Sequence, residues 1–237
     1  MTLTNAHTAP ARPNLLLFGS EDPLFHEKIK GLRAKVEYMI EETGIRSLAV
    51  TSAISGEGKT LLSARLAGSL ASTGRKRVLL VDADLRKRDL TRSMGFSRQT
   101  GLSDLIAGKR EAAGYVLKTE TNGLDFLPSG PTVESSHEMI AGSHFADVVK
   151  ELGDLYDFLV FDTPPVLPIA DALALRGRID RFLFVFRALH TPKDLFRQAI
   201  EELGTDFVLG VVMNGIESRS DGYYKKYYGK YYVPRTG

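Results

Sequence analysis

The sequence SLAVTSAISGEGKT (residues 47–60) places an apolar run, a short glycine-containing loop and the start of an apolar-periodic segment one after another. This order predicts a strand, a loop and the N-terminus of a helix, the setting in which Gly-Lys-Thr binds phosphate. Backbone N–H groups in the loop can converge on phosphate oxygens, and the following helix adds its positive dipole end. Lys59 can reach the β- and γ-phosphates, and the Thr60 hydroxyl can ligate Mg²⁺. The expected nucleotide-binding residues are Ser55, Gly56, Glu57, Gly58, Lys59, Thr60 and Leu61.

One position departs from the strict phosphate-loop pattern. The usual first glycine of G-x-x-x-x-G-K-[ST] is Ala53 in this chain. A small residue still lets the backbone turn, so we keep the prediction of a phosphate-binding loop.

Composition indicates a soluble globular protein and excludes several classes. The chain has 237 residues, 43% hydrophobic and 25% charged, with a net charge of +2 and no cysteine. Disulfides and thiolate metal sites are therefore excluded, and a cytoplasmic location is expected. The small net charge gives no reason to expect a nucleic-acid partner. No apolar run approaches the roughly 18 residues of a membrane span. Residues 1–20 read as a disordered lead, 21–217 as one domain and 218–237 as a flexible tail.

Two further apolar runs end in carboxylates. Residues 78–81 (VLLV) are followed by Asp82 and Asp84, and residues 158–161 (FLVF) are followed by Asp162. Buried parallel strands read as continuous apolar runs, and ligands bind at the carboxyl ends of such strands. An Asp-x-Asp pair can also serve only as a turn or helix cap. Its place one unit after a phosphate loop favours a metal or base role, and Asp162 is placed as a second carboxylate near Mg²⁺.

The rest of the domain alternates between helical and strand patterns. We expect a mostly parallel, doubly wound α/β sheet flanked by helices. Asn214 ends the last strand and is a candidate adenine contact, with a turn residue as the equal alternative. Thr191 and Asp171 are expected as helix N-caps. Helices are expected at 23–42, 59–73, 101–109, 138–152 and 192–203, and further strands at 124–127, 181–187 and 207–213.

The first predicted helix carries Glu27, Lys30 and Arg33 at a spacing of three, which puts them on one side. A solvated face with weak ion pairs is the plainer explanation of this spacing. A subunit contact is the other.

The end of the chain is rich in tyrosine. Three Tyr-Tyr pairs alternate with lysines and a glycine without helical or strand periodicity, so packed core is not expected. Such a segment could be a stacking platform for single-stranded nucleic acid, a membrane-surface tail, a swapped edge strand or a site of modification. The six tyrosines are Tyr223, Tyr224, Tyr227, Tyr228, Tyr231 and Tyr232.

The motifs AISGEGKT, VLLVDADLR and FLVFDTPP, followed by a tyrosine cluster, together resemble the bacterial tyrosine autokinases of polysaccharide export, the BY-kinases. These kinases have a P-loop NTPase fold of the MinD type. HEKIKGLRAK resembles the family's E-x-x-R-x-x-R oligomerisation helix, with Glu27, Lys30 and Arg33 at the charged places. GLSDLIAGK, LPSGP and PPVLPIADALAL match further family segments, so the resemblance covers roughly residues 24–232. Ser55 replaces a usual proline, Lys30 a usual arginine, and Ser135-Ser136 a common Asn-Pro.

The resemblance implies an ATP- and Mg²⁺-dependent tyrosine kinase. Lys59, Asp82, Asp84 and Asp162 would be catalytic, with Thr60, Asp82 and Asp162 as metal ligands and Asp82 preferred over Asp84 as the base. Tail tyrosines of a neighbouring subunit in a ring would be the acceptors, and their phosphorylation would break the ring. The partners would be a membrane-embedded polysaccharide co-polymerase, acting through its cytoplasmic segment, and a tyrosine phosphatase. The kinase would be peripheral at the inner face of the membrane, on a polypeptide separate from its activator, with a piece of a longer membrane fusion protein as the alternative.

Two other functions remain open at this stage. The ParA and MinD ATPases are dimerisation switches with related motifs, but their second loop lysine corresponds to Ile54 here. A non-catalytic scaffold that binds ATP and docks through its tail is the other alternative.

Overall fold

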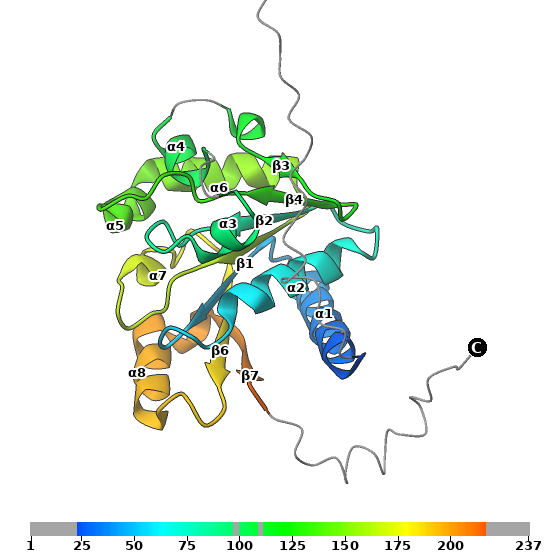
Figure 1. Ribbon diagram of the computed structural model, residues 1–237, viewed down its shortest axis with the longest axis vertical. Helices are drawn as coiled ribbons and strands as arrows, with labels where there is room; N and C mark the ends of the chain where they lie inside the picture. Colours follow the sequence, from blue (N-terminus) through cyan, green and yellow to red (C-terminus); the bar gives the residue numbers. More distant parts are fainter. Residues whose placement is uncertain (1–22, 97–99, 109–110, 217–237) are drawn as a thin grey trace, which may run out of the picture.

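The computed structural model describes residues 23–96, 100–108 and 111–216. Its centre is a seven-stranded sheet in the order β3-β4-β2-β5-β1-β6-β7 (Figure 1). Every neighbouring pair is parallel except β3 with β4. The strands are β1 (Ser47–Ser52), β2 (Val78–Asp82), β3 (Leu117–Lys118), β4 (Leu124–Leu127), β5 (Phe158–Asp162), β6 (Arg181–Arg187) and β7 (Val208–Asn214).

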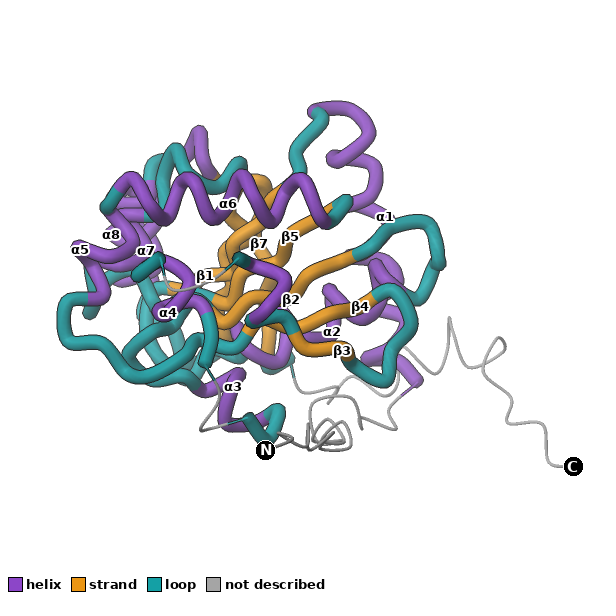
Figure 2. Tube along the Cα trace, turned by 90° about the horizontal axis from the view of Figure 1, so that it is seen from above, coloured by secondary structure: helices purple, strands orange, loops and turns teal. Residues whose placement is uncertain are grey.

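Helices cover both faces of the sheet, as Figure 2 shows for α2 and α6. One face carries α1 (Pro23–Thr43), α2 (Lys59–Ala71) and α3 (Asp89–Ser93). The other carries α4 (Leu102–Ile106), α5 (Ser136–Ala141), α6 (Ser143–Leu155), α7 (Asp171–Ala174) and α8 (Lys193–Leu203). Two short 3₁₀ turns are η1 (Ala112–Gly114) and η2 (Thr205–Phe207). Among the described residues, no helix combines the length and the apolar character that crossing a bilayer requires.

The central strands are buried on both faces because they separate two apolar cores. In β2, Leu79 and Val81 join the core under α6, whereas Val78 and Leu80 join the core under α1 and α2. All five residues of β2 and all five of β5 are buried. This is why these strands read as continuous apolar runs in the sequence rather than as alternating ones.

The predicted α/β class and parallel sheet are confirmed, with local corrections. The helix expected at 138–152 is two helices, because Gly142 adopts an extended backbone (ψ 160°) between α5 and α6. Thr191 does not cap α8, which has Pro192 at its N-cap and no side-chain cap. Asp171 lies inside the first turn of α7 rather than before it. The short antiparallel strand β3 and helix α3 were not predicted, since neither is long enough to show a period.

Candidate nucleotide and phosphoryl-transfer site

Sheet register brings the predicted carboxylates and the glycine loop to one edge. Asp82 at the end of β2 is the direct neighbour of Asp162 at the end of β5. Asp162 in turn lies opposite Val50 of β1, the strand that leads into the loop. Because all three strands are parallel, their carboxyl ends meet at the same edge. The topology alone therefore assembles the site from segments more than a hundred residues apart.

Two glycines give the loop its shape. Gly56 and Gly58 have φ angles of 84° and 92°, in the left-handed region that residues with a side chain rarely adopt. Gly58 is also the N-cap of α2. A Cβ atom at Gly58 would overlap the amide of Asn214, which donates from Nδ2 to the Glu57 carbonyl at 2.9 Å. The strand end of β7 is thereby fixed directly against the loop.

The Glu57 carboxylate stabilises the glycine loop through buried hydrogen bonds. Its side chain is fully buried, and Oε2 accepts a hydrogen bond from the Ile54 N–H at 2.8 Å. Oε1 accepts the hydroxyl of Thr191, whose oxygen also accepts the Arg187 N–H at 2.9 Å. The carboxylate therefore ties the loop to the connection between β6 and α8. In this structure Glu57 shapes the loop through its side chain, and its role toward nucleotide would be indirect.

Asp162 lies beneath the start of α2. It accepts the Ser63 hydroxyl at 3.0 Å and a hydrogen bond from the Thr60 side chain. Burial raises its pKa to about 6, against the opposing effect of the Lys59 charge. Lys59 and Thr60 are the first two residues of α2, so the Thr60 hydrogen bond and the Lys59 charge both act on the carboxylate from the helix N-terminus.

Asp82 is held more tightly than the sequence indicated. Thr91 donates to its Oδ2 from both the hydroxyl (2.6 Å) and the backbone N–H (2.8 Å). The Asp84 N–H donates to its Oδ1 at 3.1 Å. Burial, followed by the negative charge of Asp162, raises the pKa of Asp82 to about 8. Burial also raises the pKa of Asp84, whose Oδ1 accepts the Lys87 N–H at 2.8 Å.

These groups fit Mg²⁺ chemically. Asp82, Asp84 and Asp162 are all buried, and the charges of Asp162 and Asp84 raise the pKa of Asp82 while that of Asp84 raises the pKa of Asp162, so a cation would relieve this repulsion. No group of three or more His, Asp or Glu side chains in the described part of the chain forms a cage that could hold a metal by itself. Mg²⁺ is commonly held by one or two carboxylates together with phosphate oxygens and water. Thr60, Asp82 and Asp162 match that pattern.

The segment after Asp84 carries three consecutive basic residues, each anchored by a hydroxyl. Lys87 Nζ donates to Ser55 of the glycine loop at 2.9 Å. Arg86 Nε donates to Ser136 at 2.8 Å. Arg88, with an unusual left-handed φ of 57°, donates from Nε to the Ser129 hydroxyl at 3.1 Å. The three cationic side chains thus lead to three different segments: the glycine loop, α5 and the residues after β4.

The predicted oligomerisation residues do not share one environment. Glu27 and Lys30 form an exposed ion pair at 2.7 Å. Arg33 instead turns toward α2, where Nη1 donates to the Ser69 carbonyl at 3.2 Å, and it pairs with Glu37 at 3.7 Å. The expectation that all three project to one side is therefore wrong for Arg33.

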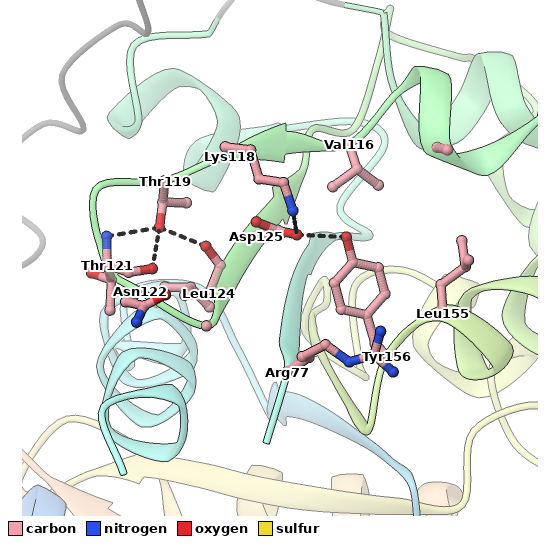
Figure 3. Close-up of a pocket in the computed structure, with 12 residues that line it drawn as sticks. Arg77, Val116, Lys118, Thr119, Thr121, Asn122, Leu124, Asp125, Leu155 and Tyr156 are labelled. Carbon is pink, nitrogen blue, oxygen red and sulfur yellow. Dashed lines mark hydrogen bonds and ion pairs between the residues drawn. The ribbon is translucent and has the colours of Figure 1, made fainter. Parts of the chain in front are cut away.

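A separate hollow of about 630 Å³ lies where β2 and β4 begin, at the edge opposite the glycine loop (Figure 3). At its centre, Asp125 Oδ2 accepts Lys118 Nζ at 2.6 Å and the Tyr156 hydroxyl at 2.7 Å. Burial raises the pKa of Tyr156. The hollow is not part of the phosphate-binding edge.

The supporting roles of several residues were missed by sequence reasoning. Thr91, Ser63 and Thr191 hold Asp82, Asp162 and Glu57, and Ser136 with Asp171 holds Arg86. Single Ser and Thr residues carry no distinctive local signal, because their role depends on contacts far away in the chain. Only Ser63, one helical turn after Lys59, could have been found by its spacing. The six tail tyrosines lie outside the described residues.

The fold and this edge define a P-loop nucleotide-binding protein. A family model described as "AAA domain" matches residues 45–179. The chain is 33% identical over 207 residues to the putative tyrosine-protein kinase CapB of Staphylococcus aureus, covering 86% of this chain and 90% of CapB. It is 34% identical over 220 residues to the putative tyrosine-protein kinase EpsB of Ralstonia solanacearum, covering 92% of this chain but 29% of EpsB. The chain thus spans less than a third of that relative's length.

Comparison with solved structures agrees with the sequence comparison. The kinase domain of the Escherichia coli tyrosine kinase ETK superposes with a TM-score of 0.80 at 26% identity, covering 92% of this chain and 86% of that one. MinD from Pyrococcus horikoshii, solved with Mg-ADP, superposes with a TM-score of 0.57 at 20% identity, covering 71% and 68% of the two chains. This second likeness shows the fold alone. The chain belongs to the CapB-like family of bacterial tyrosine kinases, the BY-kinases.

Proposed function

We propose that this protein is an ATP-dependent tyrosine autokinase that phosphorylates the C-terminal tyrosines of a neighbouring copy and thereby regulates polysaccharide synthesis or export. The observation that carries the proposal is the convergence of the glycine loop, Asp82, Asp84 and Asp162 at one sheet edge. In a chain with three Tyr-Tyr pairs at its end, such an edge has both a donor site and an acceptor in the same molecule.

The loop residues would bind and orient the triphosphate. The N–H groups at the start of α2 would bind the phosphates, and Lys59 would offset charge that develops on the transferring phosphoryl group. Thr60, Asp82 and Asp162 would hold Mg²⁺. When bound, Mg²⁺ would neutralise charge on the β- and γ-phosphates. Asn214, whose amide nitrogen already donates to the loop, keeps its side-chain oxygen for the adenine amino group.

The acceptor tyrosine needs a base because its hydroxyl has an ordinary pKa of about 10. Its oxygen would attack the γ-phosphorus while the bond to the β–γ bridging oxygen breaks and ADP leaves. The phenolic proton would pass to a carboxylate. We assign this role to Asp84, since Asp82 is proposed as a metal ligand and is further held by hydrogen bonds from Thr91 and Asp84. Asp84 accepts the backbone N–H groups of Lys87 and Arg86 and has no proposed metal contact, so it is the carboxylate left for the incoming hydroxyl.

Incubation with labelled ATP and Mg²⁺, followed by mass spectrometry of the tail, tests the proposal. We expect label on residues within 223–232, loss of that label in Lys59→Met, and retention in the matched control Lys150→Met on the exposed face of α6. ATP hydrolysis or ATP-dependent dimerisation without tail label would instead support a MinD-like switch. Nucleotide binding with neither would support a scaffold.

The partners follow from the family rather than from the geometry. We propose a homo-oligomeric ring, activation by the cytoplasmic segment of a membrane-embedded polysaccharide co-polymerase, and reversal by a tyrosine phosphatase. The kinase would then work at the inner face of the membrane through its partner. Faster tail labelling in the presence of the isolated activator segment is the expected result, and an unchanged rate would argue against this partner.

A further inference from the structure

We propose that Arg86 forms a phosphate-reading subsite beside the catalytic carboxylates, and that it binds a phosphotyrosine already present in the acceptor tail. The kinase would then prefer a Tyr-Tyr pair in which one member carries phosphate. This inference rests on the proposed function, and it names the substrate class within that function.

Arg86 is held in a built site. Its Nε donates to Ser136 Oγ at 2.8 Å and lies 3.5 Å from Asp171 Oδ2. The Ser136 hydroxyl donates to the same Asp171 oxygen at 2.6 Å. Ser136 is fully buried and the Asp171 side chain is 1% exposed, whereas that of Arg86 is 45% exposed. Buried groups thus fix the inner end of the guanidinium, and its outer end meets solvent.

The cluster of Arg86, Ser136 and Asp171 contains one buried polar atom that lacks a hydrogen-bond partner. Asp171 Oδ1 is buried and has no hydrogen-bond partner. Leaving a buried acceptor unpaired is unfavourable, so a carboxylate here is costly as a purely structural group. Its negative charge instead offsets that of Arg86 and keeps the guanidinium near the sheet edge. The Nη groups of Arg86 remain available as a fork of donors that matches a phosphate.

The direction of Arg86 separates it from the nucleotide. Lys87 turns to Ser55 in the glycine loop, on the nucleotide side. Arg86 turns the other way, to α5 and α7, and Arg88 follows it to Ser129 and Thr132. The backbone N–H of Arg86 meanwhile donates to Asp84, the proposed base. An anion bound by Arg86 would therefore lie near Asp84 but away from the glycine-loop contact that Lys87 makes.

The tyrosine-rich C-terminal tail has the composition that a phosphate-binding subsite at Arg86 would recognise. Before phosphorylation it carries Lys225, Lys226 and Lys230, which a cationic subsite would repel. A phosphotyrosine adds a charge of about −1.5 to −2 and three acceptor oxygens. Because the tyrosines occur in adjacent pairs, a phosphate on one member would lie beside the hydroxyl of the other.

Peptides that span residues 221–230 test this, with Tyr223 and Tyr224 replaced by phenylalanine. One peptide carries phosphotyrosine at 227 or 228 with the other tyrosine free, and its partner carries phenylalanine in place of the phosphotyrosine. We expect wild type to favour the primed peptide by about tenfold in kcat/KM, in the range of one charge-assisted hydrogen bond. The ratio should fall toward one in Arg86→Gln and decrease in Asp171→Asn and Ser136→Ala. Arg92→Gln, an exposed arginine paired with Asp89, should keep the ratio.

Binding of the same peptides to wild type with Mg-ADP gives a second, independent measurement. Tighter binding of the primed peptide that is lost in Arg86→Gln supports the subsite. Equal rates and equal binding for the two peptides, or a preference that survives Arg86→Gln, would overturn it. If neither peptide nor tail is ever phosphorylated, the kinase proposal fails, while the binding measurement still decides whether Arg86 reads phosphotyrosine.

Discussion

Asp82 and Asp162 are neighbours in the register of β2 and β5, and both are almost fully buried. Burial favours the neutral form of a carboxyl, and a second carboxylate nearby adds to the effect. Thr91, Thr60 and Ser63 donate hydrogen bonds that oppose it without cancelling it. Near neutral pH, the proton that Mg²⁺ would displace is therefore chiefly that of Asp82, whose pKa is raised to about 8.

This predicts an unusual pH dependence of stability for the protein in EDTA. The pKa values of Asp82 and Asp162 are raised to about 8 and about 6, whereas both are near 3.9 in an unfolded chain. The folded state thus binds more protons between these values, so its contribution to stability is complete below pH 4 and is lost as the pH rises through 8. Urea unfolding should give a lower free energy at pH 8 than at pH 5. Asp82→Asn should reduce that difference, and an unchanged difference would contradict the assignment.

Gly58 should be required for two separable reasons. Gly58→Ala places a Cβ at φ 92° and against the Asn214 amide. We expect a loss of about 1–2 kcal/mol from backbone strain and, in addition, weaker nucleotide binding. Gly74→Ala is the matched control, because Gly74 also has a left-handed φ (68°) but nothing within 4 Å of the added Cβ. Urea unfolding should show destabilisation of both variants, at least as large for Gly58→Ala, and fluorescent-ADP titration should show an affinity loss only for Gly58→Ala.

At the scale of elements, three strand ends converge on the glycine loop. The loop leaves β1, the connection after β6 binds it through Thr191, and the end of β7 binds it through Asn214. The loop is therefore shaped before nucleotide arrives, which reduces the ordering entropy that binding must overcome.

Removing the Thr191 hydroxyl should show how much its hydrogen bond to Glu57 contributes to nucleotide affinity. Thr191→Val leaves a buried oxygen of Glu57 without its donor, so we expect nucleotide affinity to fall about three- to tenfold, the range of a single hydrogen bond. Thr73→Val is the control, since that hydroxyl donates to the Leu70 carbonyl and accepts the Arg75 N–H, both at the end of α2 remote from the glycine loop. Titration with fluorescent ADP decides between them. Equal affinities for the two variants would show that the hydrogen bond between Thr191 and Glu57 does not affect nucleotide binding.

The elements most readily predicted from the sequence are those whose pattern is long or punctuated. The apolar runs of β1, β2 and β5, and the period of α1, indicated the sheet and its flanking helices directly. The break at Gly142 was missed because the apolar spacing continues across it. Strand β3 spans two residues and exists only through its pairing with β4. Such features depend on tertiary contacts rather than on local preference.

The residues of the candidate site likewise divide into those that the sequence predicts and those that it does not. Lys59, Thr60, Asp82, Asp84 and Asp162 could be predicted because each follows a buried strand or opens a helix. Their supports could not, since Thr91 meets Asp82 from nine residues away and Asp171 meets Ser136 across 35 residues. Glu57 and Asn214 were expected to contact nucleotide, and the structure adds that they contact each other.

At the scale of the whole molecule, α1 presents a surface that the domain itself does not use. Ile29, Val36 and Ile40 face α2 and the sheet, and Arg33 is engaged with Ser69 and Glu37. Glu27 and Lys30 remain exposed as a pair, with side chains 43% and 57% accessible. Of the three residues that match the family's oligomerisation motif, these two are the ones placed to meet a second copy.

Lys30→Glu should therefore separate assembly from folding. The substitution sets two negative charges side by side at the surface, which a neighbouring copy would have to bury. Light scattering after gel filtration should show a smaller mass than wild type. The free energy of unfolding should change little, because an exposed ion pair contributes about 0–1 kcal/mol. Lys150→Glu on α6 controls for net charge and should keep the wild-type mass, whereas Arg33→Ala should lower stability through its lost contacts with α2. If Lys30→Glu assembles as wild type does, α1 is a solvated face and the subunit contact lies elsewhere.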